Sequence, residues 1–157
     1  MELAILDDYM KVALEAADWE PVRRRGVEIA VFDAAFGSVE EAAAKLAPFE
    51  IVNLLRERRH FTRALIERLP NLKLIAMTGR RAPSLDIGAA TERRIVICNT
   101  HGGEGGASTA EMAWTLLLAG ARDLVKADRG VRAGRWHEGL RAGTVLEERR
   151  LGVVGLG

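Results

Sequence analysis

The sequence lacks cysteine pairs, clustered histidines, a surplus of one charge and any long apolar run. Its one cysteine, Cys98, excludes an internal disulfide framework. Lysine and arginine number 23 against 22 for aspartate and glutamate, so the net charge of +1 favours neither nucleic acid nor an acidic membrane surface. No stretch approaches the roughly 18 apolar residues of a membrane span, and the first residues do not resemble a signal peptide. We therefore expect a cytoplasmic protein without nucleic-acid or membrane partners.

Motifs of metal and nucleophilic chemistry are also missing. His60, His101 and His137 are scattered along the chain without metal-ligand spacing. There is no Gly-x-Ser-x-Gly motif and no cysteine–histidine pairing. Asp7 and Asp8 follow the first apolar run, where they could hold a metal at a strand end or cap a helix. We predict no metal site in this chain.

The first hundred residues alternate between short apolar runs and helical patterns. The runs suit buried parallel strands, predicted at residues 3–6, 27–32, 51–55, 72–77 and 95–97. Helices are predicted between them, at residues 11–19, 39–46, 62–69 and 86–92. Ser38 with Glu41 forms a capping box, and Asp86 can cap the fourth helix. Cys98 at the end of the last run is expected to be a buried thiol. This alternation predicts a doubly wound α/β fold, a parallel sheet with helices on both faces.

The later part of the chain begins with four glycines among residues 102–106, which predict a flexible connector. Ser108 and Glu111 suggest a second capping box, which starts a long helix towards Val125. That helix is apolar on most of its faces, so it is expected to be well buried, and without a partner it would expose apolar surface. We expect a helix end and loops over residues 126–150.

The last seven residues, 151–157, combine a short apolar run with Gly-x-Gly. A strand that enters such a turn is how a dinucleotide-binding βαβ unit begins, and the following helix holds the pyrophosphate. The sequence stops after the second glycine, before the third glycine and the acidic residue of that fingerprint. We therefore expect the chain to be the N-terminal part of a larger enzyme.

A candidate ligand site lies at the carboxyl ends of the predicted strands, where open parallel sheets bind their ligands. Gly79 lets a ligand approach the backbone, and Arg80 and Arg81 add positive charge there. Arg56 follows the preceding strand. These donors suit a small carboxylate, which arginine can bind through two hydrogen bonds. A solvent-facing turn with ordinary surface arginines explains the spacing equally well.

Five segments, in this order, resemble the D-isomer-specific 2-hydroxyacid dehydrogenases, which depend on NAD. The segments are residues 61–75, 78–87, 89–100, 108–118 and 151–157. The resemblance implies a flavodoxin-like substrate (catalytic) domain over residues 1–100. It implies a hinge, a long interdomain helix and connecting loops over residues 101–150, and the first strand of a Rossmann NAD-binding domain over residues 151–157.

The same resemblance implies roles for six residues. Arg56, Gly79 and Arg80 would bind the substrate, with the Gly79 amide facing its carboxylate. Thr109, Gly155 and Gly157 would bind the cofactor, NAD or NADP, the two glycines being the first two of the fingerprint. In this family the catalytic arginine, glutamate and histidine lie after the fingerprint, so no catalytic residue is assigned here. The chain has Gly-Arg-Arg-Ala-Pro from Gly79 where the family often has Gly-x-Gly or Gly-Val, which leaves the identity of the substrate open.

The function implied is hydride transfer between NAD(H) and a 2-hydroxy or 2-oxo acid, by an enzyme that is a homodimer when intact. We expect this chain alone to be inactive. Two alternatives remain. One is a non-catalytic flavodoxin-like binding or assembly module, and the other is a receiver-type signalling domain. A receiver needs a phosphoacceptor aspartate at the end of its third strand, where this chain has Asn53.

Overall fold

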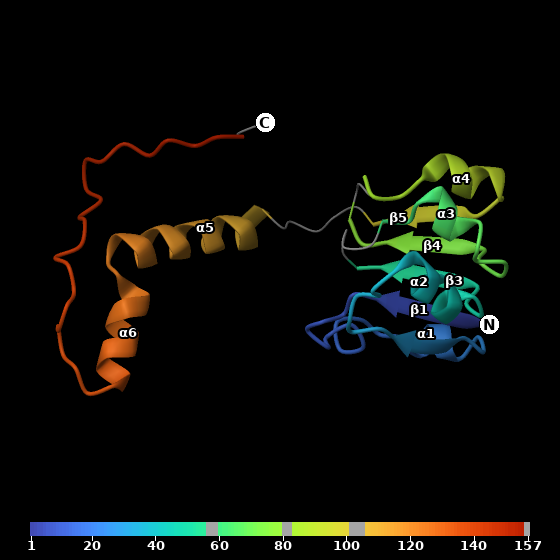
Figure 1. The fold of residues 1–157 in the computed structure, drawn as a ribbon, viewed down its shortest axis with the longest axis horizontal. Coiled ribbons are helices and arrows are strands. Elements are labelled where there is room, and N and C mark those ends of the chain that lie inside the picture. The colour runs from blue at the N-terminus through green and yellow to red at the C-terminus, as the bar shows by residue number, and fades with distance from the viewer. Residues whose placement is uncertain (56–59, 80–82, 101–105, 156–157) are drawn as a thin grey trace. The chain divides into compact units, whose positions relative to one another are not determined.

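The computed structural model of the protein describes residues 1–55, 60–79, 83–100 and 106–155. The chain divides into two compact units, Met1–Gly103 and Glu104–Gly157. In the described residues, the first unit contains a sheet and four short helices, and the second contains two helices (Figure 1). Among the described residues no helix is both long enough and apolar enough to cross a membrane.

The first unit is built on a parallel sheet of five strands. The strands are β1 (Glu2–Leu6), β2 (Glu28–Val31), β3 (Ile51–Leu54), β4 (Leu74–Met77) and β5 (Val96–Asn99). They lie in the order β2-β1-β3-β4-β5, and every neighbouring pair is parallel. This is the flavodoxin-like order of a doubly wound sheet. The predicted fold class is confirmed, and each strand lies within about two residues of its predicted range.

The helices of this unit are α1 (Glu20–Arg23), α2 (Val39–Leu46), α3 (Arg63–Ile66) and α4 (Ile87–Glu92). Ser38 Oγ accepts the Glu41 amide at 3.1 Å, and Asp86 Oδ1 accepts the Ala89 amide at 2.8 Å, so both predicted caps are confirmed. The carboxylate of Glu41 accepts the Gly37 amide at 2.6 Å, one residue before the cap. The α3 helix is shorter than predicted, and Thr62 makes no side-chain capping bond.

The helix predicted over residues 11–19 is wrong, because this segment forms turns. The Asp8 carboxylate accepts the amides of Val12 and Ala13 at 3.0 and 2.9 Å. Lys11 adopts a left-handed conformation with φ +57°. Side chains that bond nearby backbone amides offer the chain an alternative to helical hydrogen bonds. The regular helix α1 begins only at Glu20, next to Pro21.

The two faces of the sheet are covered unequally. The larger core lies on one face, where α2, α3 and α4 contribute Leu46, Leu65 and Ala90. The smaller core, on the opposite face, centres on Leu3, Ile5 and Ala13. It does not extend to β5, where Val96 is 61% exposed. Cys98 lies on the same face of β5 as Val96 and is exposed, so the prediction of a buried thiol is wrong.

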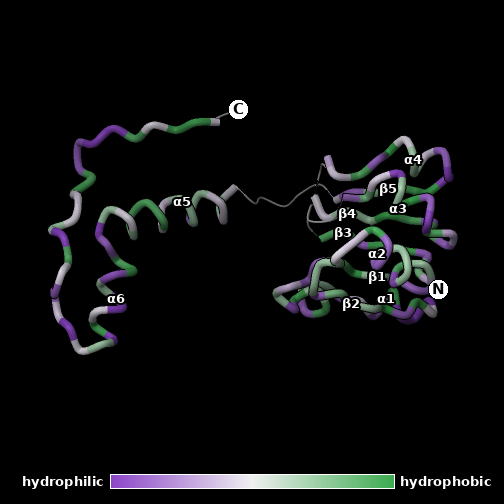
Figure 2. The backbone as a smooth tube through the Cα atoms, in the orientation of Figure 1, coloured by the Kyte–Doolittle hydropathy of each residue, from purple (hydrophilic) through white to green (hydrophobic). Residues whose placement is uncertain are grey.

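The second unit contains α5 (Gly106–Ala121) and α6 (Leu124–Arg132), joined at Asp123, whose φ of +50° is left-handed. Because α5 already begins at Gly106, Ser108 lies inside the helix and the predicted cap at that residue is wrong. The expected burial of α5 is also wrong, since none of its residues is buried and Trp114 is 54% exposed. Figure 2 shows that apolar residues make up much of α5.

Residues 124–155 differ from the prediction in two places. The α6 helix occupies a stretch where we expected a helix end followed by loops, and its Arg132–Asp128 pair at 3.0 Å has the favourable spacing of one helical turn. Leu151–Val154 form no strand, and Val154 is fully exposed. A strand needs backbone partners on a neighbouring strand, and no strand lies beside these residues in the described part of the second unit.

Candidate functional site

The carboxyl ends of β3, β4 and β5 form a connected edge of the first unit. Thr78, the first residue after β4, donates its amide to Leu54 O at 3.0 Å. The Thr78 hydroxyl donates to the carbonyls of Leu54 and Leu55, at 3.1 and 2.8 Å. Thr100, the first residue after β5, donates its amide to Met77 O at 3.2 Å. These bonds continue the strand ladder past the last strand residues and hold three chain segments side by side.

Gly79 occupies the turn after β4 in a conformation that requires glycine. Its φ is +108°, a region that residues with a side chain rarely adopt, while a Cβ placed on it would meet no described atom within 4 Å. The described residues therefore leave the backbone at this turn open. The Gly79 amide donates to Thr100 Oγ1 at 3.0 Å, which ties the turn after β4 to the end of β5.

The six predicted site residues fall into three groups. Gly79 lies at the carboxyl edge of the sheet as predicted, although its amide is bonded to Thr100. Arg56, Arg80 and Gly157 lie outside the described residues. Thr109 lies in α5, and Gly155 is exposed in a segment without regular secondary structure, with φ +82°. The roles given to all six remain predictions.

Thr100 is the functional candidate that sequence reasoning missed. The resembling segment 89–100 ends on it, yet nothing in the local pattern shows that its hydroxyl reaches Gly79. The signal that could have found it is positional, because a polar residue directly after a strand lies at the ligand-binding edge of a parallel sheet.

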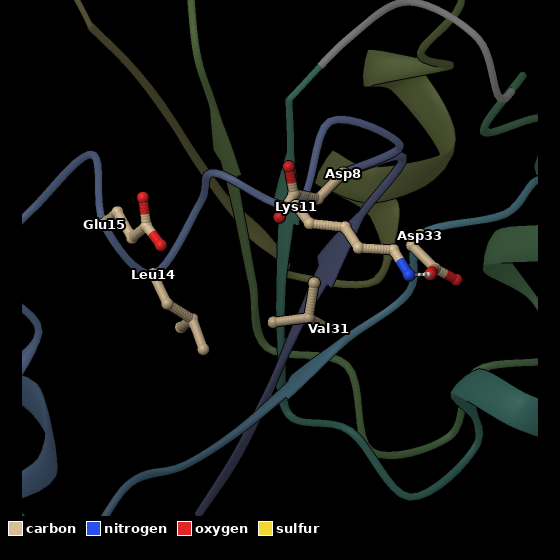
Figure 3. A pocket seen from close by; sticks show the side chains of 6 residues that line it. All are labelled: Asp8, Lys11, Leu14, Glu15, Val31 and Asp33. Atoms are coloured by element: carbon tan, nitrogen blue, oxygen red, sulfur yellow. Dashed lines mark ion pairs between the residues drawn. The ribbon is translucent and has the colours of Figure 1, made fainter.

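The ends of β1 and β2 border a hollow, which is drawn in Figure 3. Asp8 lines this hollow but is only 4% exposed, and both of its carboxylate oxygens accept hydrogen bonds from backbone amides. Lys11 pairs with Asp33 across the hollow at 3.2 Å. In the described part of the chain no three histidine, cysteine, aspartate or glutamate residues are placed to hold a metal. Asp8 therefore bonds backbone amides, but the residues that follow it form turns and not the helix that it was expected to cap.

Among the described residues, the Thr78 hydroxyl and the Gly79 amide donate within the edge, so the Thr100 hydroxyl is the neutral donor that these bonds leave for an anion. A threonine hydroxyl both donates and accepts, and a turn with φ above zero exposes the backbone to a ligand. No carboxylate takes part in the hydrogen bonds that tie these three residues together. Such a site suits a small ligand that only accepts hydrogen bonds, as an ionised carboxylate does.

Comparison with known proteins decides the family. Residues 4–148 match the model of the D-isomer specific 2-hydroxyacid dehydrogenase catalytic domain. The chain belongs to this family. The resemblance drawn from the sequence is thus confirmed, and the receiver-type hypothesis loses its support.

Several members of this family resemble the chain over most of its length. The D-3-phosphoglycerate dehydrogenase of Archaeoglobus fulgidus is 36% identical over 146 residues, which are 93% of this chain and 27% of the relative. The glyoxylate reductase of Thermococcus litoralis is 41% identical over 100 residues, 59% of this chain and 30% of the relative. The chain thus spans about a third or less of the length of these two relatives.

Solved structures show the same likeness. A phosphoglycerate oxidoreductase from Vibrio cholerae O395 matches with a TM-score of 0.81 and 32% identity, over 93% of this chain and 46% of that one. A Polaromonas protein, described as a D-isomer specific 2-hydroxyacid dehydrogenase that binds NAD, matches with a TM-score of 0.77 and 28% identity. That match covers 100% of this chain and 49% of the other. The flavodoxin-like sheet found here is therefore the fold of known family members.

Proposed function

We propose that this chain provides the substrate-binding part of a dehydrogenase that transfers hydride between NAD(H) or NADP(H) and a 2-hydroxy or 2-oxo acid. The observation that carries the proposal is the family match over residues 4–148, on a sheet whose carboxyl edge presents the open Gly79 turn. The alternative of a non-catalytic binding module shares the fold but gives no reason for a family match of this length.

The substrate is a small carboxylate held at the carboxyl edge of the sheet, beside Gly79 and Thr100. Arg56 and Arg80 follow Leu55 and Gly79 in the sequence, shortly after the ends of β3 and β4. Guanidinium groups bind carboxylates through paired hydrogen bonds. We propose that these two arginines supply the charge, while the edge supplies a neutral donor.

The cofactor is assigned to Thr109, Gly155 and Gly157. Gly155 has the positive φ that a glycine turn uses. However, Leu151–Val154 form no strand, so the strand-to-turn geometry that holds a pyrophosphate is not formed in the described residues. We therefore derive no step of the reaction through the dinucleotide, and the choice between NAD and NADP stays open.

The second unit supports self-association of the intact enzyme. The α5 helix exposes the side chains of Met112, Trp114, Leu116 and Leu118. Apolar surface of this kind marks an interaction site. We propose that the intact enzyme is a homodimer in the cytoplasm, with no nucleic-acid or membrane partner.

The test is an activity assay on protein purified from its native source, together with its intact mass. Glyoxylate and hydroxypyruvate are offered with NADH or NADPH, and loss of nicotinamide absorbance is followed. We expect turnover by the native protein and none by the recombinant 157-residue chain, whose family places the catalytic arginine, glutamate and histidine after the glycine fingerprint. Native protein that reduces neither acid, or any other short 2-oxo acid, contradicts the proposal.

A further inference from the structure

Thr78 and Thr100 end neighbouring strands but use their hydroxyl groups in opposite ways. The Thr78 hydroxyl is a donor, and its one hydrogen is spent on the carbonyls of Leu54 and Leu55. The Thr100 hydroxyl is an acceptor, since the Gly79 amide donates to it at 3.0 Å. A hydroxyl has one hydrogen and two lone pairs. The bond from Gly79 therefore leaves the Thr100 hydrogen for another acceptor, and the described residues supply none.

We infer that Thr100 is a further substrate-binding residue, whose hydroxyl donates a hydrogen bond to the carboxylate of the bound acid. The inference rests on the proposed function. Thr100 is exposed at the carboxyl edge, where a ligand can reach it. An ionised carboxylate only accepts hydrogen bonds, so it complements a hydroxyl that still has its hydrogen to donate.

The bond from Gly79 prepares Thr100 for this role. Threonine is branched at Cβ and has few side-chain rotamers, and the Gly79 amide fixes the position of Oγ1 among them. A donor that is already ordered costs less entropy when the ligand binds. The amide also polarises the hydroxyl, since hydrogen bonds in a chain strengthen one another. Gly79 thus acts on the substrate through Thr100.

This arrangement revises how Gly79 serves the site. A direct bond from its amide to the substrate would compete with the bond to Thr100. When the substrate binds through Thr100 instead, the Gly79 amide keeps its bond to Thr100 Oγ1. The carboxylate then gains a charge-assisted bond from the Thr100 hydroxyl. The glycine is then required for the φ of +108° that lets its amide point at Thr100.

The experiment measures binding of oxamate, a stable analogue of a 2-oxo acid, to the full 157-residue chain. Amide NMR titrations are run on wild type, Thr100→Val, Thr100→Ser and the matched control Thr78→Val. Ethyl oxamate, the neutral ester, is titrated in parallel. Loss of one hydrogen bond to a charged group predicts roughly tenfold weaker oxamate binding in Thr100→Val. Thr100→Ser should retain the affinity, Thr78→Val should change it less, and the uncharged ester should lose less affinity than oxamate in Thr100→Val.

Each other outcome has a defined meaning. Equal oxamate affinity in wild type and Thr100→Val overturns the inference and leaves the proposed function standing. Equal weakening of oxamate and ester in Thr100→Val shows that Thr100 only supports the turn, and this also overturns it. No oxamate binding by the wild-type chain contradicts both proposals. Thr100→Ala is the second variant if the amide spectrum shows that Thr100→Val is unfolded.

Discussion

Arg63 on α3 and Glu92 on α4 form a two-point ion pair, with Nη1–Oε2 at 2.6 Å and Nη2–Oε1 at 2.9 Å. Parallel hydrogen bonds of this type are the strong form of the arginine–carboxylate contact. The pair joins two helices that cover the same face of the sheet, 29 residues apart in the sequence. It fixes α4, whose C-terminal end leads into β5 and so towards Thr100.

The Arg63–Glu92 pair predicts how the stability of the protein changes as the pH is lowered. Hydrogen bonding and charge from Arg63 lower the pKa of Glu92 below its ordinary value of 4.5. A carboxyl group whose pKa is lower in the folded than in the unfolded state contributes its full stabilisation of the fold at pH values above the unfolded pKa. This contribution is lost as the pH falls through the folded pKa. Glu92→Gln should therefore lower the thermal midpoint at pH 7, and the difference from wild type should vanish in acid. The control is Glu15→Gln, an exposed glutamate for which the described residues provide no ion pair. A difference that stays constant with pH contradicts the prediction.

Gly79→Ala should destabilise the first unit by about 1–3 kcal/mol, the usual cost of a side chain in a sparsely populated backbone conformation. The reason is its φ of +108°, because an added Cβ meets no other atom of the described residues within 4 Å. Denaturant unfolding of the whole chain measures the change. Gly152→Ala is the matched control, since Gly152 has equal space and no positive φ. Equal effects of the two substitutions would mean that conformation at Gly79 is not the cause.

Asp8→Ala should cost about 1–3 kcal/mol, since two buried or half-buried amides lose their acceptor. Asp8→Asn keeps one acceptor oxygen and should lose less. Asp33→Ala removes only the exposed partner of Lys11, and a surface pair of this kind contributes about 0–1 kcal/mol. Urea unfolding of the three variants gives the order. A larger loss in Asp33→Ala than in Asp8→Ala would refute the capping role of Asp8.

Ser38→Ala should cost about 1 kcal/mol, because its hydroxyl caps α2 by accepting the Glu41 amide. Ser108→Ala provides the comparison, since Ser108 lies inside α5 and alanine favours a helix interior. Circular dichroism during thermal unfolding follows both variants. The prediction fails if Ser108→Ala destabilises the protein as much as Ser38→Ala does.

The local signals of the first unit were sufficient to predict most of its elements. Apolar runs closed by polar residues marked the five strands, and Ser38 and Asp86 marked the starts of α2 and α4 because each cap depends on residues three positions away. The turns at residues 11–19 escaped prediction, since helical spacing there competes with two bonds from the single carboxylate of Asp8.

The second unit was harder to predict because its patterns depend on partners. The apolar composition of α5 predicts burial, yet a helix is buried only where another surface covers it, and in the described residues Trp114 remains exposed. Leu151–Val154 have the composition of a strand without a neighbouring strand to complete their hydrogen bonds. The α6 helix was missed because its charged residues and glycine indicated loops, although Leu124, Ala127 and Val131 recur at helical spacing.

The sequence by itself determined the parallel α/β class, the family resemblance and the position of Gly79 at a strand end, because each depends on residues close together in the chain. Only the tertiary structure decided that Thr100 accepts the Gly79 amide while Thr78 spends its hydroxyl on Leu54 and Leu55. Gly79 and Thr100 are 21 residues apart, and they meet because β4 and β5 are paired in register and both end at the same edge. Hydrogen-bond direction between such residues depends on that pairing, which no local pattern contains.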